Sequence, residues 1–186
     1  MAAPDADLHP HRPAIARYVR RLVRDRAEAE DLTQETFVRA IRDRATLRDD
    51  AALLSWLYQI ATHVCLDRLR QRARILSHNS DERLEDLRVA DTRTPSALRV
   101  VQQLEMSACV QQYVARLSDT YRAVLLLHDV DGLTDGEISG LLGVPLTTVK
   151  MRLHRARQKL QVMLDEACAV SQDDRGVVVC EPKPNH

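Results

Sequence analysis

The stretch at residues 134–160, TDGEISGLLGVPLTTVKMRLHRARQKL, constrains the fold more than any other part of the chain. Its pattern predicts two helices joined by a tight turn. Thr134 and Glu137 fit a capping box, in which each side chain satisfies a backbone amide at the start of a helix. Gly143 and Pro145 mark the turn, because glycine adopts the left-handed conformation that ends a helix and proline can open the next one.

The second of these helices has two contrasting sides. Apolar residues recur at steps of three and four, which predicts a buried stripe: Leu146, Val149, Leu153, Ala156, Leu160 and Met163. The other side is cationic or able to donate hydrogen bonds, as a helix lying in a major groove must be. It carries Thr147, Thr148, Lys150, Met151, Arg152, His154, Arg155 and Arg157. The stretch therefore predicts either a DNA-binding helix-turn-helix or an ordinary helix pair with a solvated basic face.

Composition favours an all-α fold. The 186 residues include five glycines and are 45% hydrophobic but only 3% aromatic, so we expect helices with cores of Leu, Val, Ile and Ala. No apolar run approaches the roughly 18 residues that span a bilayer, and no signal-peptide core is visible. We therefore expect a cytoplasmic protein without membrane insertion. The net charge is zero, so only local clusters of charge bear on nucleic-acid binding.

The apolar pattern divides the chain into two small helical domains and three connecting or terminal parts. The expected parts are a disordered start (1–12), a helical domain (13–75), a flexible acidic linker closed by Pro95 (76–95), a second helical domain (96–165) and a short tail (166–186). Within the tail, a turn signal at 174–176 adjoins Val177, Val178 and Val179, which have β preference.

A helix is expected at residues 27–44, and it carries a compact polar patch. Its core side is formed by Ala29, Leu32, Phe37, Ala40 and Ile41. Asp31, Gln34 and Glu35 lie together on another side, because separations of three and four residues bring helical side chains alongside one another. Such a patch suits a basic partner surface, although taken alone it is more often simply solvated.

A strong helix is expected at residues 53–74. Trp56 belongs to its apolar series and is expected in the core, whereas Tyr58 and His63 lie off that stripe and are freer to face a ligand. The helix ends in alternating arginines, Arg68, Arg70, Arg72 and Arg74. With the basic helix near residue 150, this cluster suggests two separate contacts with a polyanion.

The four cysteines, Cys65, Cys109, Cys168 and Cys180, show no CxxC spacing and are expected to be reduced thiols. Cys168 and Cys180 are weak metal candidates, because a closed zinc site needs two further ligands. The alternatives for this pair are a metal or redox sensor and a tail with unreactive thiols. No cofactor is expected. No nucleophile, base and orienting group occur together, so an enzyme is not expected.

The order of these parts resembles the extracytoplasmic-function (ECF) group of bacterial RNA polymerase sigma factors, in the sigma-70 family. The resemblance rests on AEDLTQETFVRAI and SWLYQIATHVCLDRLRQR, an acidic linker, and LSDTYRAVLLLHDVDG leading into the helix-turn-helix. It covers about residues 10–165, and two unrelated signatures occur in the expected order. It implies a non-catalytic initiation subunit that binds core polymerase, recognises −35 and −10 promoter elements and assists promoter opening.

The resemblance also implies roles for individual residues. In the region 2-like domain it assigns Asp31, Gln34 and Glu35 to the clamp helices of the polymerase β′ subunit. It assigns the −10 element to the loop at 47–52 and to Tyr58, Thr62, His63 and Asp67, with Arg68, Arg70 and Arg72 on phosphates. In the region 4-like domain it assigns the −35 element to Lys150, Met151, His154 and Arg155, flanked by Arg152 and Arg157, with Thr147 and Thr148 meeting phosphate at the helix N-terminus.

Two departures from the family pattern affect base preference. Met151 stands where a small polar residue is common, so an apolar contact is expected there, and His63 stands where the family often has Asn. The implied partners are core polymerase, through the β′ clamp helices and the β flap, and promoter DNA. Control is expected from an anti-sigma factor or from the tail acting in cis. The alternative function is a free-standing helix-turn-helix regulator whose first domain mediates dimerisation or ligand binding.

Overall fold

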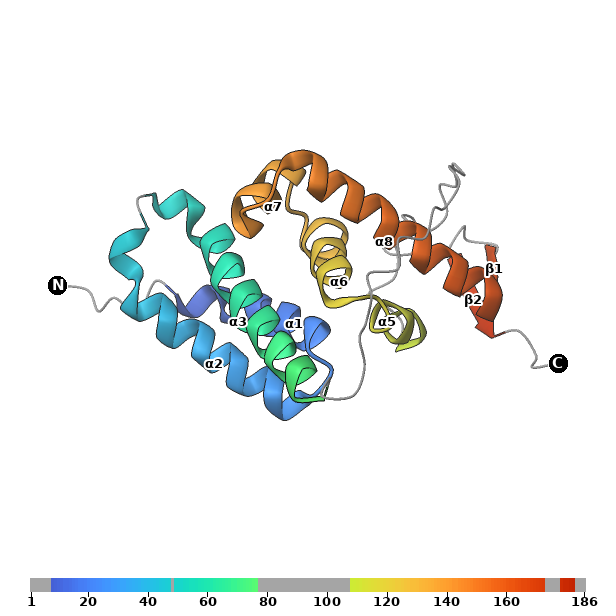
Figure 1. Cartoon of the computed structure of the whole chain (residues 1–186), viewed down its shortest axis with the longest axis horizontal. Helices are drawn as coiled ribbons and strands as arrows, with labels where there is room; N and C mark the ends of the chain where they lie inside the picture. The colour runs from blue at the N-terminus through green and yellow to red at the C-terminus, as the bar shows by residue number, and fades with distance from the viewer. Residues whose placement is uncertain (1–7, 48, 77–107, 173–177, 183–186) are drawn as a thin grey trace.

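The computed structural model describes residues 8–47, 49–76, 108–172 and 178–182 (Figure 1). Helices dominate the described part of the chain, which confirms the prediction of an all-α fold. The first group contains α1 (Arg12–Leu22), α2 (Arg26–Arg42) and α3 (Leu53–Leu76). The second group contains α5 (Ala108–Val114), α6 (Asp119–Leu125), the π-helical turn η5 (Leu126–Val130), α7 (Asp135–Leu142) and α8 (Leu146–Ala167).

The first group is a three-helix bundle with an aliphatic and tyrosine core. Ile15, Tyr18 and Leu22 of α1 are fully buried together with Leu57 and Ala61 of α3. The chain turns sharply between α1 and α2, where the Asp25 carboxylate accepts a hydrogen bond from the Glu28 amide at 2.8 Å and so caps α2.

The start of the bundle differs from the expectation. Leu8 is buried in the core, and a 3-10 turn, η1 (His9–His11), leads directly into α1. The prediction of disorder through residue 12 is therefore wrong for residues 8–12, because an isolated apolar residue finds a place in the bundle.

The connection between α2 and α3 is a loop, as expected, but it contains two short 3-10 turns. They are η2 (Arg44–Thr46) and η3 (Asp50–Ala52). An ion pair at 2.7 Å between Arg44 and Asp50 joins the two turns. The loop therefore holds a defined course into the first turn of α3.

The helix-turn-helix forms as the sequence predicts. The Thr134 hydroxyl accepts a hydrogen bond from the Glu137 amide at 3.3 Å, and the Glu137 carboxylate accepts one from the Thr134 amide at 2.8 Å. Gly143 ends α7 with a φ of 64°, the left-handed conformation that favours glycine. Leu146 is a correction, because it is 43% exposed rather than part of the buried stripe, which begins at Val149.

Much of the predicted linker and of the helix expected at 96–116 lies outside the described residues. Within them, α5 begins at Ala108 and buries Val110 and Val114. Ser118 occupies the N-cap position of α6 as expected, although its side chain makes no capping hydrogen bond.

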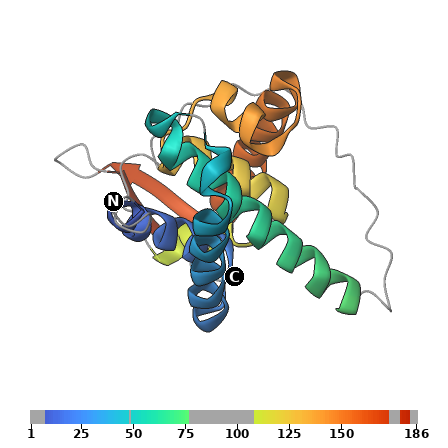
Figure 2. The ribbon, with the colours of Figure 1, turned by 90° about the vertical axis from the view of Figure 1, so that its left-hand side faces the viewer.

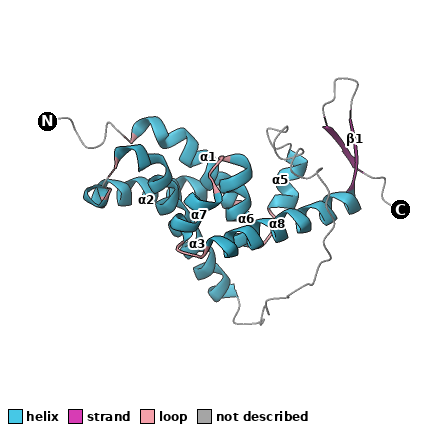
Figure 3. Cartoon of the chain, turned by 90° about the horizontal axis from the view of Figure 1, so that it is seen from above, coloured by secondary structure: helices cyan, strands magenta, loops and turns pink. Residues whose placement is uncertain are grey.

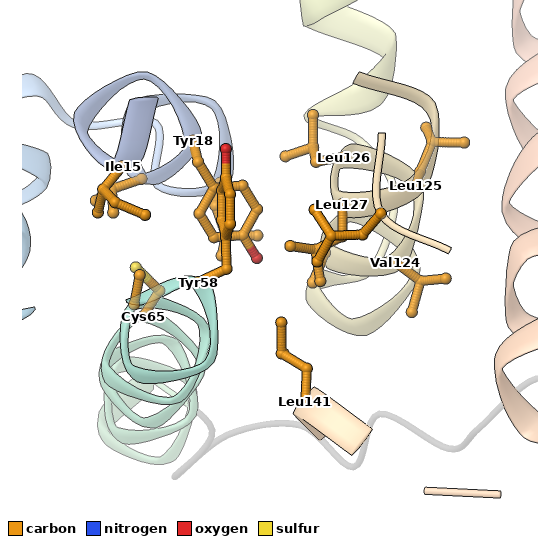
Figure 4. Close-up of a cluster of buried hydrophobic side chains, with 14 of the residues drawn as sticks. Ile15, Tyr18, Tyr58, Cys65, Val124, Leu125, Leu126, Leu127 and Leu141 are labelled. Carbon is orange, nitrogen blue, oxygen red and sulfur yellow. The ribbon is translucent and has the colours of Figure 1, made fainter. Parts of the chain in front are cut away.

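The two helical groups pack directly against each other. The helix α3 lies against α7 and α6, and α1 lies against η5 and α6 (Figure 2). Tyr18 and Tyr58 face Leu126 and Leu127 across this boundary (Figure 4), and all four residues belong to one continuous core. The sequence predicts two modules, and the structure adds that the modules share an apolar interface.

The tail forms a two-stranded antiparallel hairpin that follows α8 without a break, at the end of α8 far from the first helical group (Figure 3). The strands are β1 (Cys168–Gln172) and β2 (Val178–Pro182). The β preference near residue 178 is thus realised, while the predicted turn lies outside the described residues. In the backbone register Cys180 pairs with Val170 and Cys168 with Pro182, so the two cysteines are not directly opposite each other.

Candidate nucleic-acid interface

The open side of α8 carries most of the residues expected at duplex DNA. Thr147, Lys150, Met151 and His154 are exposed, and Thr148, Arg152 and Arg155 are half-buried. The first acidic residue of this helix is Asp165, near its end. The first three turns of α8 therefore present hydrogen-bond donors, positive charge and one exposed methionine, which are the groups that can read base edges and phosphates.

Arg157 follows Lys150 and His154 at helical steps, but its side chain is half-buried and bonded within the protein. Its Nε donates to Asp129 Oδ2 at 3.0 Å, its Nη2 bonds the other oxygen of Asp129, and Nη2 also lies 3.2 Å from Nδ1 of His128. The Asp129 side chain is almost fully buried, so Arg157 supplies the charge that compensates it. In this structure Arg157 ties η5 to α8, and its contact with DNA stays a prediction.

The first half of α3 borders a surface hollow of about 290 Å³. Trp56 and His63 line it from α3, and Arg39 and Arg42 line it from α2. His63 is exposed, with Nδ1 2.8 Å from the Gln59 carbonyl oxygen. Trp56 is only partly buried, so the prediction of a core tryptophan holds for one side of the ring.

Tyr58 and Thr62 are placed differently from the expectation. Tyr58 is only 3% exposed and donates from its hydroxyl to Asp131 Oδ1 at 2.9 Å, across the boundary between the helical groups. Thr62 is fully buried, donates to the Tyr58 carbonyl at 2.7 Å and lies 2.8 Å from the Tyr18 hydroxyl. The prediction that these two side chains face DNA is wrong for this arrangement, because Tyr58 is engaged by Asp131 of the second group and Thr62 by Tyr18 of the first.

The electrostatics of this boundary follow from burial. Burial raises the pKa of the Asp131 carboxyl, and the Tyr58 hydrogen bond and the charges of Arg21 and Arg17 oppose that rise. Burial and the nearby Asp131 charge raise the pKa of Tyr58. Asp131 Oδ2 has no hydrogen-bond partner among the described residues, so half of a buried carboxylate is unsatisfied.

The second half of α3 is exposed and basic. Arg68, Arg70 and Arg72 all face solvent, as does Asp67. Arg70 pairs with Asp67 at 3.2 Å, and Arg72 lies 3.5 Å from Glu28 of α2. These pairs are exposed and weak, so the guanidinium groups can exchange partners for phosphates.

The polar patch on α2 is exposed, as the sequence predicts for Asp31, Gln34 and Glu35. Glu35 pairs with Arg39 at 2.7 Å. A groove of about 540 Å³ runs between α2 and α3, with Asp31 and Glu35 on one wall and Asp67 and Arg68 on the other.

Comparison with known proteins matches each of the two helical groups to a family model. The family model described as sigma-70 region 2 matches residues 8–75, and the model described as sigma-70, region 4 matches residues 107–160. The chain is 35% identical over 144 residues to the ECF RNA polymerase sigma factor SigW of Bacillus subtilis, covering 74% of this chain and 75% of SigW. This chain belongs to the ECF group of sigma-70 family sigma factors.

Other relatives agree with this assignment. The sigma factor is 34% identical over 151 residues to SigE of Mycolicibacterium smegmatis, a match that covers 81% of this chain and 57% of SigE. A solved structure of the sigma factor RpoE in complex with the anti-sigma factor NepR from Bartonella quintana shares the fold, with a TM-score of 0.64 and 23% identity over 85% of this chain and 94% of RpoE. The protein is therefore a non-catalytic subunit that directs transcription initiation, and the alternative of a free-standing regulator falls away.

Two surface residues of the sigma factor escaped the sequence analysis. Val38 is 59% exposed, and Ile41, which was expected in the core, is 41% exposed. Both residues follow Asp31 and Glu35 along α2 at steps of three and four. This spacing in the sequence could have predicted that they lie on the same exposed side. The exposed side of α2 therefore joins a polar patch to an apolar one.

The described residues hold no group of three or more His, Cys, Asp or Glu side chains that could bind a metal ion. Cys65 is buried, and burial raises the pKa of its thiol to about 12, so it stays protonated near neutral pH. None of the described helices is long and apolar enough to cross a bilayer.

Proposed function

We propose that the sigma factor reads the −35 element in duplex form with the open side of α8. The observation that carries this proposal is the exposed row of Lys150, Met151 and His154 on a helix that a capped helix-turn-helix holds in place. Arg152 and Arg155 flank the row, and Thr147 and Thr148 lie in the first turn, where backbone amides attract phosphate. Met151 meets an apolar base edge such as a thymine methyl.

The −10 element is read beside the first half of α3. The hollow next to Trp56 and His63 offers an aromatic side chain and nearby arginines, which suits a base that has left the stack. Asp67 and the exposed arginines Arg68, Arg70 and Arg72 follow along the same helix and meet the DNA backbone. Tyr58 becomes available only if the two helical groups separate, whereas Thr62 is bonded to Tyr18 within region 2.

Separation of the groups is a requirement of this proposal. Packed helices such as α3 and α7 have axes about 8–10 Å apart. The −35 and −10 elements are about 25 base pairs apart, roughly 85 Å of duplex at 3.4 Å per base pair. The docked arrangement is therefore an inactive one, and promoter binding draws region 4 away from region 2. The functional domains are residues 13–75, with Leu8 packed on them, and 96–165, joined by 76–95 and followed by the tail at 166–186.

Core polymerase binds the exposed side of α2. Asp31, Gln34 and Glu35 supply the polar part of this surface and Val38 and Ile41 the apolar part, which together suit the clamp helices of the β′ subunit. Region 4 contacts the β flap. The sigma factor works in the cytoplasm with the polymerase, and an anti-sigma factor controls it, as the RpoE complex with NepR suggests by analogy.

Run-off transcription with purified core polymerase tests the proposal, on a fragment from upstream of the protein's own gene. The double substitution Asp31→Lys with Glu35→Lys is expected to abolish specific transcripts and association with core. Glu166→Lys, an exposed acid near the end of α8 and outside the α2 surface, is the matched control and should retain both. Lys150→Glu should keep association with core but lose the −35 duplex. Binding of DNA as a dimer without any association with core would overturn the proposal.

A further inference from the structure

Four arginines line one wall of a groove between the two regions. Arg17, Arg20 and Arg21 lie on α1, and Arg24 lies just beyond the end of α1 at Leu22, in the turn that leads into α2. The groove has a volume of about 470 Å³, and none of the described residues that line it is acidic or aromatic. Its opposite wall belongs to region 4, where α5 and the residue after it contribute Gln111, Gln112, Val114 and Ala115.

The four arginines have no partners for their charges within the described part of the chain. None of them forms an ion pair or a side-chain hydrogen bond there, whereas Arg26 and Arg44 each pair with a carboxylate. Three of the four are exposed, and Arg21 is half-buried. The carbonyl end of α1 stabilises positive charge at Arg20 and Arg21 but leaves their guanidinium donors available. Like charges at steps of three and four repel each other, so a bound anion stabilises this cluster.

A buried arginine of region 4 is bonded to the opposite wall of the groove. Arg122 is only 3% exposed, its Nη1 donates to the Ala115 carbonyl at 3.0 Å, and its Nη2 bonds Asp119. Its Nε has no hydrogen-bond partner among the described residues. Burial lowers the pKa of Arg122; the charge of Asp119 opposes this effect and the nearby charge of Arg24 adds to it. An anion beside Arg24 therefore offsets a repulsion between two arginines of different regions.

A second cavity, of about 450 Å³, shares Arg24 with the groove and reaches Arg122. The carboxylates of Asp25 and Asp119 also line this cavity. Both already have partners, because Asp25 caps α2 and Asp119 pairs with Arg122. Their negative charges favour an anion on the groove side of Arg24, where the described lining residues include no acid.

We propose that the groove binds a short chain of phosphates, as found in tripolyphosphate or in the phosphate tail of a nucleotide. Guanidinium groups present forked pairs of donors that match phosphate oxygens, and four of them match the charge of a chain better than that of one phosphate. The groove has the volume of a small-ligand site. Because no aromatic side chain is among its described lining residues, a base has nothing to stack on, and recognition rests on the phosphates.

A ligand in this groove contacts both regions at once. One wall belongs to α1 and the other to α5, so the bound ligand stabilises the docked arrangement and docking in turn raises the affinity for the ligand. This inference does not depend on which promoter elements the sigma factor reads.

Isothermal titration calorimetry with the full chain and sodium tripolyphosphate, at constant ionic strength, tests the binding. Arg20→Gln combined with Arg24→Gln is expected to weaken binding by about tenfold, because two exposed charges are removed from the groove. Arg42→Gln is the matched control and should stay within about twofold, since Arg42 is an exposed arginine at the opposite end of α2, roughly 24 Å along that helix. Equal losses in both variants, or no binding by the wild type, would overturn the proposal.

A comparison of anions identifies what the groove recognises. ATP should bind within about threefold of tripolyphosphate, which would support recognition of the phosphate chain alone. Binding of ATP more than tenfold tighter would still support a phosphate-chain site but would assign it to a nucleotide. Sulfate at the same ionic strength should bind at least tenfold more weakly, and equal binding of sulfate would overturn the proposal in favour of a general anion surface.

Two further measurements test the position of the site. Tripolyphosphate should slow hydrogen exchange of the α7 amides in the wild type and not in the double variant, because the ligand holds the two regions together. Unchanged exchange in the wild type would overturn the claim that the ligand joins both regions. A single-stranded DNA 16-mer should displace tripolyphosphate poorly; displacement at equal phosphate concentration would assign the groove to nucleic acid and overturn the proposal.

Discussion

The two longest helices, α3 and α8, both carry residues expected at DNA, but they differ in how much of each is accessible. The helix α8 keeps one open side for most of its length, whereas α3 is covered in its middle by region 4. Tyr58 lies under that cover, while Lys150 and His154 remain accessible. On the proposed function, the helix-turn-helix is a complete reading unit within one domain, whereas the −10 surface is complete only after the domains separate. The difference locates control of the protein at α3 rather than at α8.

Arg157→Ala should produce the largest change on the α8 side. It leaves the buried Asp129 carboxylate with only its hydrogen bond to His128, which we expect to lower the free energy of unfolding of region 4 by about 2–3 kcal/mol. Urea denaturation followed by circular dichroism measures this. Arg152→Ala is the control, because that residue flanks the open side and should change stability little. A variant as stable as wild type would show that Arg157 does not stabilise the buried Asp129 carboxylate.

Tyr58→Phe probes the cover over α3. The substitution removes the hydrogen bond at 2.9 Å to Asp131 and leaves a buried carboxylate without a partner, so docking should weaken by about 1–2 kcal/mol. Hydrogen exchange of the α7 amides should accelerate accordingly. Tyr18→Phe loses a bond to Thr62 within region 2 and should leave the α7 amides protected. Equal exchange in both variants would show that the hydroxyl of Tyr58 does not hold the regions together.

The docking of region 4 on α3 should also depend on pH, with a smaller effect than the substitution of Tyr58. Burial raises the pKa of Asp131 against the opposing influence of Tyr58, Arg17 and Arg21, so the docked state binds the proton more tightly than the separated state. Docking is therefore strengthened as the pH falls through the raised pKa, and the gain is complete below the ordinary carboxyl value of about 3.9. Exchange of the α7 amides, corrected for intrinsic rate, should slow on mild acidification, and Asp131→Asn should remove this response. Faster exchange at lower pH in the wild type would contradict it.

Leu146→Ala should have the smallest effect. Leu146 is 43% exposed at the start of α8, so its truncation should change the free energy of unfolding by less than about 0.5 kcal/mol. Val149→Ala, one turn further and fully buried, should cost about 1–2 kcal/mol and provides the comparison. Thermal unfolding of both variants measures the difference, and equal losses would place Leu146 in the core after all.

Sequence features close to the helix ends predicted the helices well. The residues that were placed wrongly are those whose positions depend on tertiary contacts. The capping box at Thr134 and the left-handed Gly143 lie within a few residues of the helix ends that they define, so the sequence alone reveals them. Arg157 and Tyr58 could not be placed in this way, because their partners lie 28 and 73 residues away in sequence. The 3.6-residue period of apolar positions predicts one buried side of a helix. It cannot predict that a second domain will bury a further side of the same helix.

On the proposed function, the hydrogen bond between Tyr58 and Asp131 lowers the affinity of the free sigma factor for its promoter. If docking is favoured by about 2 kcal/mol, only about 3% of free molecules are open, and the apparent affinity for a promoter falls about 30-fold below the intrinsic one. On the proposed function, core polymerase that captures the open form removes this penalty, so the sigma factor binds promoter DNA only after it has bound the enzyme. A single phenol hydroxyl can in this way set the order in which two much larger partners are bound.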